Sequence, residues 1–506
     1  MVDLGLIYDT FAEYRIWLPV FVGTAFIATA LISRASWPKA PGPALAQYTR
    51  LWYAYMVWKG DFELCNVELH KKYGKIVRVG PNDYSIEDLA AAKTIYGAGS
   101  HFTKSEWYDG FNTPGYELSN LFGLRDPIMH SKLRRKVANV FSMSALISYE
   151  PHVDGAINVF RTRLDERTES RQPFDLAQFL QFYAFDVIGE ITFSNRFGFL
   201  DTGSDLDSIT HTIEVAGNMA TFLGIFQRWP LVSKLTNLVF LFDSRLDDFS
   251  SEYINNGIKK YEARGGQADP DRAAPDMLTK LLDITAKDEN RGESSMIVQG
   301  AAASNVFAGS DTTGISLTSI FFQLMKHPDK LAKLQQELDT AAFQGQVSEP
   351  ITFAQSQKLP YLQAVIKEAL RLHPATGLPM WRQVPKEGAV VCGQYFPAGA
   401  NLGINSWVAH SNEDIFPDAR AFLPERWIDS SKKALSEMER YFMSFGMGAR
   451  ACIGRNISLL EMNKVVPELL RRYDFKMADP QVERLDSLNR WFVKQHNLKV
   501  RVSKRA

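Results

Sequence analysis

The chain has 506 residues, of which 45% are hydrophobic and 23% are charged, a composition ordinary for a globular protein. Its 57 basic and 57 acidic residues give a formal net charge of zero, which excludes the strongly basic composition typical of nucleic-acid-binding proteins. Cys65, Cys392 and Cys452 are too few and too scattered for a disulfide framework, and they indicate a reducing compartment.

The first residues differ in composition from the rest of the chain. Residues 16–33 carry no charge, and as a helix they would be roughly 27 Å long, about the thickness of the hydrocarbon layer of a bilayer. A cleaved signal peptide is the competing interpretation, but acidic residues precede the run and no small-residue cleavage site with a polar start follows it. We therefore expect a membrane anchor over residues 1–36, with a transmembrane helix over about 16–33. Arg34 and Lys39 follow the run, so the positive-inside rule predicts a cytoplasmic position for the remainder.

Residues 37–506 are predicted to form one folded domain, because neither a Pro-, Gly- or Ser-rich linker nor an internal repeat follows the prolines at its start. Those prolines would make a stiff hinge. Helical periodicity over 48–73 and 87–97 flanks two short apolar runs at 76–80 and 83–86. The Gly-Pro-Asn sequence between the two runs predicts a β-hairpin.

The stretch 100–125 is irregular and rich in aromatic side chains. A packed surface loop and a mobile wall over a hydrophobic ligand are equally good interpretations of it. A second apolar cluster at 220–231, among the amphipathic helical segments of 150–290, would pack in the core, meet a membrane surface or roof a ligand channel. These segments and the C-terminal strands suggest a largely apolar cavity lined by aromatic residues: Phe102, Trp107, Phe122, Phe222 and Trp491.

A helix with a dense basic face is predicted to open at His130. His130 and Arg134 lie one turn apart, so their side chains point the same way. A solvated cationic face is the alternative, chiefly for Lys132 and Lys136, which would also suit a docking patch for an acidic partner.

A long apolar helix is predicted from about Ser294 to Lys326, where His-Pro ends it. Its middle carries Ala-Gly-Ser-Asp-Thr-Thr over residues 308–313. Hydroxyl and acidic side chains are poor helix formers because they compete for backbone groups, and such a conflict inside a strong helix indicates function. A kink filled by side-chain hydroxyls is the alternative interpretation of Asp311 and Thr312.

A shorter helix is predicted between Pro360 and Pro374, with Glu368 and Arg371 on one face. Such a pair is usually a solvated bridge worth less than about 1 kcal/mol. Short apolar runs between turn residues over 374–406, and alternation near the C-terminus, predict minor β-structure.

The sequence from Phe445 to Gly454 places Cys452 in a glycine-rich loop before a helical run. Glycines there allow positive φ angles and the close approach of a flat ligand. A helix N-terminus offers free N–H donors and the positive end of the macrodipole, so we expect a lowered pKa and a thiolate at Cys452. Arg450 adds a cation placed to meet a carboxylate. A buried structural cysteine in a turn is the alternative.

This loop resembles the haem-binding signature of the cytochrome P450 family, Phe-Gly-x-Gly-x-Arg-x-Cys-x-Gly, and matches it at every fixed position. Residues 308–313 resemble the oxygen-activation motif of the same family. The Glu-x-x-Arg pair with Pro-Glu-Arg-Trp at 424–427 resembles a third signature, and His-x-x-x-Arg at 130–134 resembles a fourth, with His where many members have Trp. The resemblance covers roughly residues 35–500, and the variation at His130 is similar to fungal microsomal members of secondary metabolism.

The resemblance implies a mainly α fold with a minor β region, a single cytochrome P450 domain behind the transmembrane helix. Haem b would be the cofactor, with Cys452 as the axial ligand of its iron. Thr312 would hydrogen-bond dioxygen or a water, and Asp311 would relay protons. The remaining residues divide into a structural triad behind the haem, Glu368, Arg371 and Arg426, and cofactor-binding residues that cradle the haem or contact its propionates, His130, Arg134, Arg382, Phe445 and Arg450.

The implied reaction is monooxygenation of a small lipophilic substrate with O2. Electrons would come from a separate NADPH-cytochrome P450 reductase, with cytochrome b5 as a further donor, because the chain carries no dinucleotide-binding motif. Oxidative coupling, cyclisation or desaturation is an alternative outcome of the same chemistry, and a haem protein that binds or senses without turnover is an alternative of another class. The resemblance also implies a single-pass protein of the endoplasmic reticulum membrane whose catalytic domain faces the cytoplasm.

Overall fold

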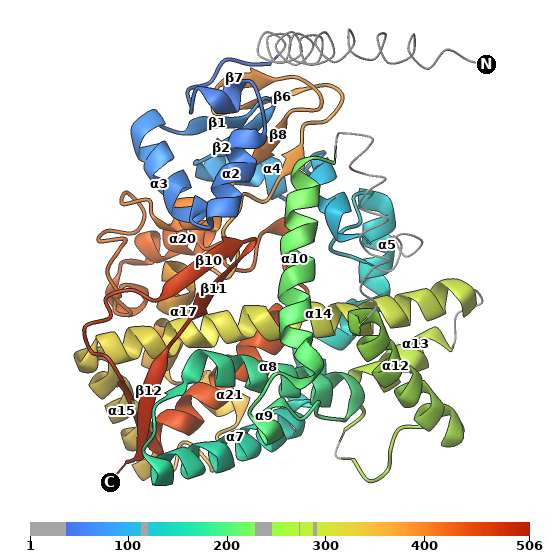
Figure 1. Ribbon diagram of the computed structural model, residues 1–506, viewed down its shortest axis with the longest axis vertical. Coiled ribbons are helices and arrows are strands. Elements are labelled where there is room, and N and C mark those ends of the chain that lie inside the picture. The colour runs from blue at the N-terminus through green and yellow to red at the C-terminus, as the bar shows by residue number, and fades with distance from the viewer. Residues whose placement is uncertain (1–36, 113–119, 228–244, 273, 287–290, 506) are drawn as a thin grey trace, which may run out of the picture.

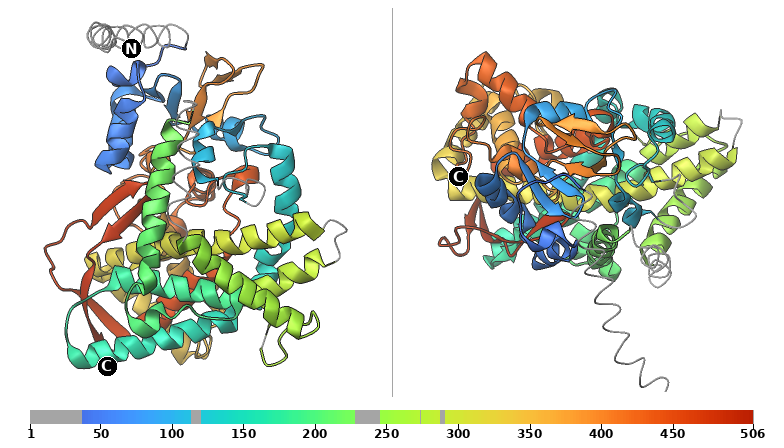
Figure 2. Two further views of the ribbon diagram at one scale, coloured as in Figure 1. Left: turned by 45° about the vertical axis from the view of Figure 1, so that its right-hand side comes forward. Right: turned by 90° about the horizontal axis from the view of Figure 1, so that it is seen from above.

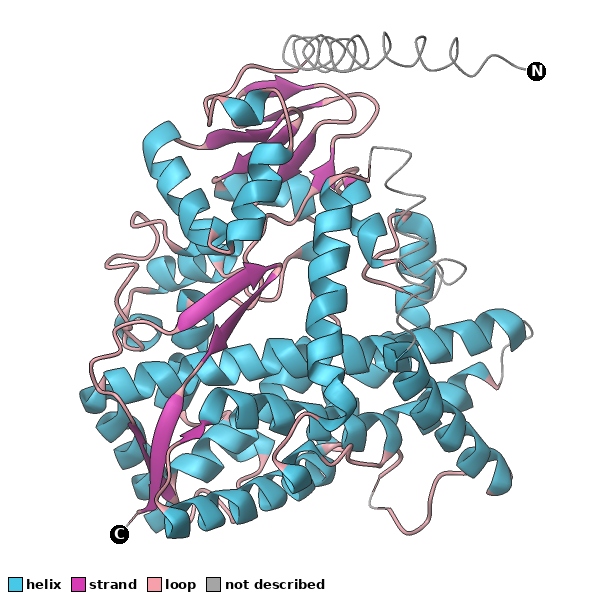
Figure 3. Ribbon diagram, viewed as in Figure 1, coloured by secondary structure: helices cyan, strands magenta, loops and turns pink. Residues whose placement is uncertain are grey.

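The computed structural model describes residues 37–505 except 113–119, 228–244, 273 and 287–290. The described residues are mainly helical, with small sheets at one end and along one side, which confirms the predicted class (Figure 3). The anchor predicted over 16–33 lies outside the described residues. Among the helices of the described part, none is both long and apolar enough to cross a bilayer.

The sheet-rich end contains the predicted hairpin, β1 (Ile76–Gly80) and β2 (Asp83–Ile86), paired antiparallel. Strands from distant parts of the chain extend this pair into a sheet of order β1-β2-β8-β5-β3, with β3 at Thr103–Lys104 and β5 at Arg382–Gln383. The remaining elements of this end are α2 (Leu51–Lys59), α3 (Phe62–Tyr73), α4 (Leu89–Tyr96), β6 (Ala389–Val391), β7 (Gln394–Phe396) and β8 (Asn401–Gly403).

The pairing of β3 with β5 matters for the site. The two strands run antiparallel, with Lys104 opposite Arg382 in the register. Directly opposite residues on neighbouring strands have their Cβ atoms about 5 Å apart. Two cations from segments far apart in the sequence are therefore held side by side by main-chain pairing.

The long predicted helix is α14 (Arg291–Lys326), which crosses the middle of the molecule in Figure 1. It packs along the buried α8 (Leu176–Phe193), and α10 (Ile209–Ile225) runs across it in the views of Figures 1 and 2. Glycines on α14 allow the close packing with α8: a Cβ at Gly309 would lie 2.6 Å from the Ile188 side chain, and one at Gly314 would lie 3.0 Å from Gln181 Cα.

The helix behind the cysteine loop is α21 (Arg455–Leu470), and a hydrogen bond of 2.9 Å between Thr313 Oγ1 and Ser458 Oγ joins it to α14. The remaining described helices of this part are α5 (Pro127–Val137), α6 (Met143–Ile147), α7 (Glu150–Ser170), α9 (Phe199–Thr202), α12 (Arg245–Ala263), α13 (Met277–Thr285), α15 (Pro328–Phe343), α16 (Phe353–Ser356), α17 (Pro360–Leu372), α18 (Ser406–His410), α19 (Arg426–Asp429) and α20 (Lys432–Tyr441).

Two further small sheets close the helical part. The C-terminal β12 (Lys499–Lys504) lies between β4 (Phe174–Asp175) and β9 (Tyr473–Met477). The hairpin of β10 (Asp486–Arg490) and β11 (Phe492–His496) brings the alternating C-terminal segment against α14 and α8. This hairpin delivers Lys494 and Trp491 to the centre of the molecule.

Candidate active site

The loop before α21 holds Cys452 in a fixed position. The Cys452 N–H donates to the Phe445 carbonyl at 2.8 Å, which closes the loop, and the Arg455 guanidinium covers the Phe445 ring. Gly446 and Gly448 have φ angles of 69° and 65°, as expected of glycines in such a loop. A Cβ at Gly448 would lie 1.8 Å from the Tyr96 carbonyl oxygen, so only glycine allows this approach to α4.

Two expectations about this loop need correction. Gly454 has a φ of −80°, so it does not use a positive φ; it is the N-cap of α21, and a Cβ there would lie 4.0 Å from Cys452 Sγ. Cys452 is exposed, yet desolvation by the protein around it raises the pKa of its thiol. The net shift of the Cys452 pKa is therefore upward, and the expected lowering of this pKa is wrong.

The groups that favour a thiolate are nevertheless present. The N–H groups of Gly454 and Arg455 and the charges of Arg134 and Arg455 all act to lower the pKa of Cys452, against the larger effect of desolvation. A metal ion bound to the sulfur supplies the additional positive charge that deprotonates such a thiol. Cys452 thus suits a metal-bound thiolate better than a free one.

Five basic side chains gather beside this thiol without a carboxylate partner among the described residues: Lys104, His130, Arg134, Arg382 and Arg450. The burial of His130 and the charges around it, first that of Arg450, lower its pKa to about 3. Burial and the charge of Arg382 lower the pKa of Arg450 to about 10. The cluster therefore combines a neutral His130 ring with basic groups that lack a carboxylate partner in the described chain, of which Lys104 and Arg382 are buried and Arg134 and Arg450 are partly buried.

The partners of these cations were only partly as expected. The Arg450 guanidinium donates to the carbonyls of Leu124, Arg125 and Asp126 at 2.7, 3.1 and 3.4 Å, and its expected contact with a carboxylate stays a prediction. Arg382 donates to the Tyr108 hydroxyl at 3.1 Å. The side chains of His130 and Arg134 make no hydrogen bond or ion pair within the described part of the chain.

These residues fit haem b. Its two propionates would supply the negative charge that the cluster lacks, and buried charges need such pairing. Its iron would take the Cys452 sulfur, whose neighbourhood is electropositive. Cys452, His130, Arg134, Arg382 and Arg450 would then hold the group, as the resemblance implies, and Phe445 would close the loop beneath it.

The motif of α14 sits in a continuous helix rather than at a break. Thr312 Oγ1 donates to the Ala308 carbonyl one turn earlier, at 2.8 Å. Ala308 is exposed in the middle of this otherwise largely buried helix. Exposure at the centre of a core helix marks a face that lines an internal space, and Thr312 lies on the same face one turn later.

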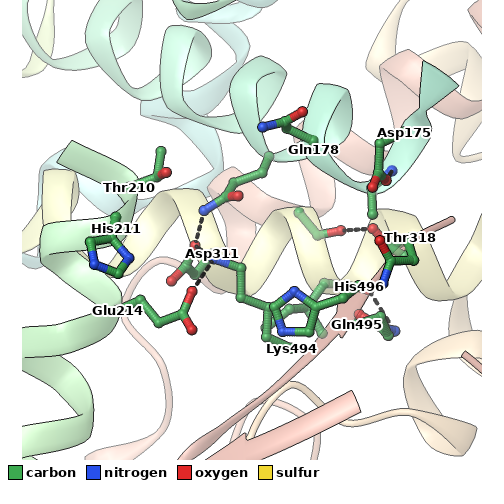
Figure 4. A pocket seen from close by; sticks show the side chains of 15 residues that line it. Asp175, Gln178, Thr210, His211, Glu214, Asp311, Thr318, Lys494, Gln495 and His496 are labelled. Carbon is green, nitrogen blue, oxygen red and sulfur yellow. Dashed lines mark hydrogen bonds and ion pairs between the residues drawn. The ribbon is translucent and has the colours of Figure 1, made fainter. Parts of the chain in front are cut away.

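Asp311 points into a network of polar groups (Figure 4). One of its carboxylate oxygens accepts a hydrogen bond from Gln181 of α8 and lies 3.6 Å from Lys494 Nζ of β11. Lys494 in turn donates to Glu214 of α10 at 3.0 Å. The side chains become more exposed along this series, from 4% for Asp311 to 17% for Lys494 and 29% for Glu214.

Each charge of this network lies beside a charge of opposite sign from the protein itself. Burial and the charge of Glu214 raise the pKa of Asp311, and Lys494 opposes them. Burial alone would lower the pKa of Lys494, but the charges of Asp311 and Glu214 raise it. A cavity of about 270 Å³ adjoins the network and is lined largely by polar side chains, among them His211 and Gln495. It leads from the surface to Asp311.

The predicted triad residues are in contact and buried. Arg371 donates to both oxygens of Glu368, at 2.8 and 2.9 Å, and Arg426 donates to Glu368 Oε1 at 3.0 Å. Trp427 Nε1 also donates to Glu368, at 2.9 Å. Glu368 is completely buried and Arg371 is 1% exposed, so the solvated bridge of the alternative interpretation is wrong. Their part in holding haem stays a prediction.

His410 links the triad to the cysteine loop, and no motif pointed to it. Its Nε2 accepts from the N–H of Met443, at 2.9 Å, so its Nδ1–H donates to the Arg371 carbonyl, also at 2.9 Å. Burial and the charge of Arg371 lower its pKa to about 3, which keeps the ring neutral. Met443 lies two residues before Phe445, so a change at Arg371 would reach the loop.

Of the aromatic residues expected to line an apolar cavity, all but one pack together in the structure, and we call this group the aromatic wall. Phe102 packs with the core of the sheet-rich end, beside Tyr84 and Val384. Trp107 and Phe222 belong instead to the cluster of Trp491, and Phe122 contacts Trp491 at a ring distance of 6.0 Å. Two residues absent from the expected set complete this wall, Tyr108 and Phe111, each 5.2 Å from Phe122.

Comparison with known proteins agrees with this site. The family described as Cytochrome P450 matches residues 39–502. The chain is 38% identical over 456 residues to a pisatin demethylase of Fusarium vanettenii, covering 89% of this chain and 87% of that protein. It is 36% identical to a cytochrome P450 monooxygenase of Aspergillus terreus, covering 90% and 93% of the two chains. It is also 36% identical to the cytochrome P450 monooxygenase cicH of Emericella nidulans, covering 92% and 93%.

Proposed function

The chain belongs to the cytochrome P450 family, and from that premise we propose that it is a monooxygenase that oxidises a small lipophilic substrate of fungal secondary metabolism. The observation that carries the proposal is the position of Cys452 beside a partly buried cluster of basic side chains that has no carboxylate of its own in the described chain. Together they match the sulfur-ligated iron and the two propionates of haem b.

Haem b, when bound, supplies the reductive activation of O2, assisted by electron donation from the thiolate sulfur. In the balanced reaction one oxygen atom enters a C–H bond of the substrate and the other leaves as water, with uptake of two electrons and two protons. The chain's own residues supply the protons. Water in the polar cavity would pass a proton to the Asp311 carboxylate, and Thr312, the next residue of α14, would present its hydroxyl on the face of the exposed Ala308.

The raised pKa of Asp311 suits this role, since a carboxyl that binds a proton more readily can pass one on at neutral pH. Lys494 keeps the carboxylate charged between transfers. The aromatic wall of Phe111, Phe122 and Trp491 would exclude bulk water and take an apolar substrate.

A demethylation is a second candidate reaction, because a relative that covers most of this chain is named pisatin demethylase. Hydroxylation of a methyl group on oxygen or nitrogen gives a product that loses formaldehyde, so the same oxygen insertion removes the methyl group. This outcome requires no residue beyond those of the site described.

Electrons would come from NADPH-cytochrome P450 reductase, with cytochrome b5 as a further donor. The basic face of α5, which carries Lys132 and Lys136, would offer the acidic donor a docking surface. Residues 16–33 would anchor the protein in the endoplasmic reticulum membrane, with the catalytic domain on the cytoplasmic side.

The test is spectroscopic first and chemical second. The purified full-length protein should give a reduced carbon-monoxide spectrum of the thiolate type and should consume NADPH when reductase is added. Mass spectrometry of extracts from strains with and without the protein should then reveal an oxygenated or demethylated product. A colourless protein, or a haem bound through nitrogen, would overturn the proposal. A thiolate spectrum without any oxidised metabolite would favour a haem protein that does not turn over.

A further inference from the structure

Lys104 is a buried lysine that no sequence motif distinguishes. It lies in β3, is 5% exposed, and donates from Nζ to the carbonyl of Phe122. The same ammonium group lies 4.1 Å from the centroid of the Tyr108 ring and 4.4 Å from that of Phe122. One carbonyl and two ring faces are weak compensation for a fully desolvated ammonium ion, whose neutralisation in the interior requires a carboxylate or phosphate.

Every charge that acts strongly on Lys104 is of the same sign. Arg382 is its partner in the strand register, and Arg450 and Arg134 also act on it. Burial, followed by these cations, holds the pKa of Lys104 well below its usual range. By contrast, Lys464, the other lysine that is buried in the described chain, has a carboxylate: it meets Glu150 at 2.8 Å.

We propose that Lys104 binds a propionate of haem b and, through its hydrogen bond to the Phe122 carbonyl, ties that edge of the cofactor to the aromatic wall of the substrate pocket. The inference rests on the proposed function, because it requires haem b at Cys452. It adds a residue from β3 to the cations expected from the motifs. It also explains why an ammonium group sits between two rings of the wall, since the group then serves the cofactor and the wall together.

The competing explanation is structural: Lys104 would only hold the Phe122 carbonyl in place. Two neutral substitutions separate the explanations. Lys104→Gln keeps an N–H donor for the Phe122 carbonyl but removes the charge, and Lys104→Met removes both while keeping a long side chain against the rings. Lys104→Arg keeps the charge. Lys494→Met is the control, because Lys494 is a partly buried lysine whose carboxylates come from the protein itself.

The measurement is the rate at which the ferric holoprotein transfers haem to excess apomyoglobin, together with the reduction potential of the bound haem. We expect Lys104→Gln and Lys104→Met to release haem roughly ten- to a hundredfold faster, the range implied by loss of one hydrogen bond to a charged group. Both should have a more negative potential, because a nearby positive charge favours the reduced iron. Lys104→Arg and Lys494→Met should release haem at close to the wild-type rate.

Equal release rates for Lys104→Gln and the wild type would overturn the proposal, as would fast release by Lys104→Arg, because charge would then not be the property that matters. Fast release by Lys104→Met alone would support the structural explanation and overturn the propionate contact. Failure of the proposed function looks different: the wild-type protein would itself lack the thiolate-type carbon-monoxide spectrum.

Discussion

Two groups of titratable side chains lie near the cysteine loop and α14, and they differ in how their charges are paired. Around Lys104, His130, Arg134, Arg382 and Arg450, all the side chains are basic, and within the described chain none of them has a carboxylate partner. On the side of Asp311, the carboxylate meets Gln181 and Lys494, and Lys494 meets Glu214. The cations of the first group lack an anionic partner in the described chain, whereas each charge of the second lies beside an opposite charge from the protein itself.

The difference separates binding from catalysis. A buried charge without a partner is costly, so a chain that gathers several of one sign implies a ligand of the opposite sign. A network whose charges already have partners within the protein needs no ligand and holds its own side chains in place. The most exposed side chain of this network, Glu214, gives it contact with water. The cation cluster therefore suits retention of haem b, and the Asp311 network suits the delivery of protons. Variants of the two groups should separate haem retention from coupling.

The substitution with the largest expected effect removes the proposed iron ligand, Cys452, and tests whether both groups of side chains act on one thiolate-ligated iron. Cys452→Ser should abolish the thiolate-type Soret band and all activity, because the serine oxygen is a much weaker donor to iron. Absorption spectra of the reduced carbon-monoxide complex provide the measurement. Retained activity in this variant would remove the common centre on which the comparison rests.

The triad of Glu368, Arg371 and Arg426 gives a reference for what it costs to break a buried network whose charges are paired within the protein. Arg371→Met would leave Glu368 buried beside Arg426 alone and would free the carbonyls of His410 and Ala419. Breaking a buried pair on one side costs about 3–5 kcal/mol, so we expect a large loss of unfolding free energy and poor haem incorporation. Urea unfolding and the haem-to-protein ratio measure the two effects. Arg371→Lys keeps the charge but loses the forked geometry, so its stability and haem content should lie between those of the wild type and those of Arg371→Met.

The motifs predicted one side of the comparison better than the other. Cys452, Asp311 and the triad lie in fixed local patterns, so their places could be read from the sequence, as could the helix of α14 and the hairpin of β1 and β2. Lys104 could not be found in this way. It is a single lysine in an aromatic stretch, and it becomes a buried cation only because β3 pairs with a strand from the other end of the chain.

The same reason applies to the partners of Asp311. Gln181, Glu214 and Lys494 come from three elements, and only the packing of α8, α10 and β11 around α14 brings them together. The expected lowering of the Cys452 pKa failed for a related reason, since the desolvation of a side chain depends on the whole fold. Phe102 was misplaced because alternative packing partners for an aromatic side chain look alike in sequence.

An intermediate effect is expected on the balanced side. Lys494→Met would leave Asp311 and Glu214 without their cation, which should raise the pKa of Asp311 further and disturb proton delivery. We expect a larger share of NADPH to be lost as hydrogen peroxide, with haem release unchanged. Lys494→Arg should restore the coupling, and Thr312→Ala, which should keep haem, provides the upper limit for peroxide. Peroxide per NADPH, measured with reductase, decides the outcome. Unchanged peroxide in Lys494→Met would leave the network a purely structural role.

The smallest effect concerns His410, the neutral member between the triad and the cysteine loop. Its pKa is about 3 in the folded protein against an ordinary value of 6.5, so folding favours the neutral ring. The stability it contributes is therefore present above about pH 6.5 and is lost as the pH falls toward 3, by at most about 1.4 kcal/mol per pH unit.

Between pH 6.5 and 5 most carboxylates remain ionised, so this window isolates the histidines. We expect His410→Asn to be less stable than the wild type at pH 7.5, because Met443 N–H loses its acceptor, but to have a flatter decline of unfolding free energy across the window. Urea unfolding followed by the Soret band at several pH values gives both slopes. Parallel slopes would mean that His410 is already protonated in the folded protein. The loop before Cys452 would then contact a charged imidazolium ring. The triad, whose charges are otherwise paired within the protein, would have an unpaired cation beside it.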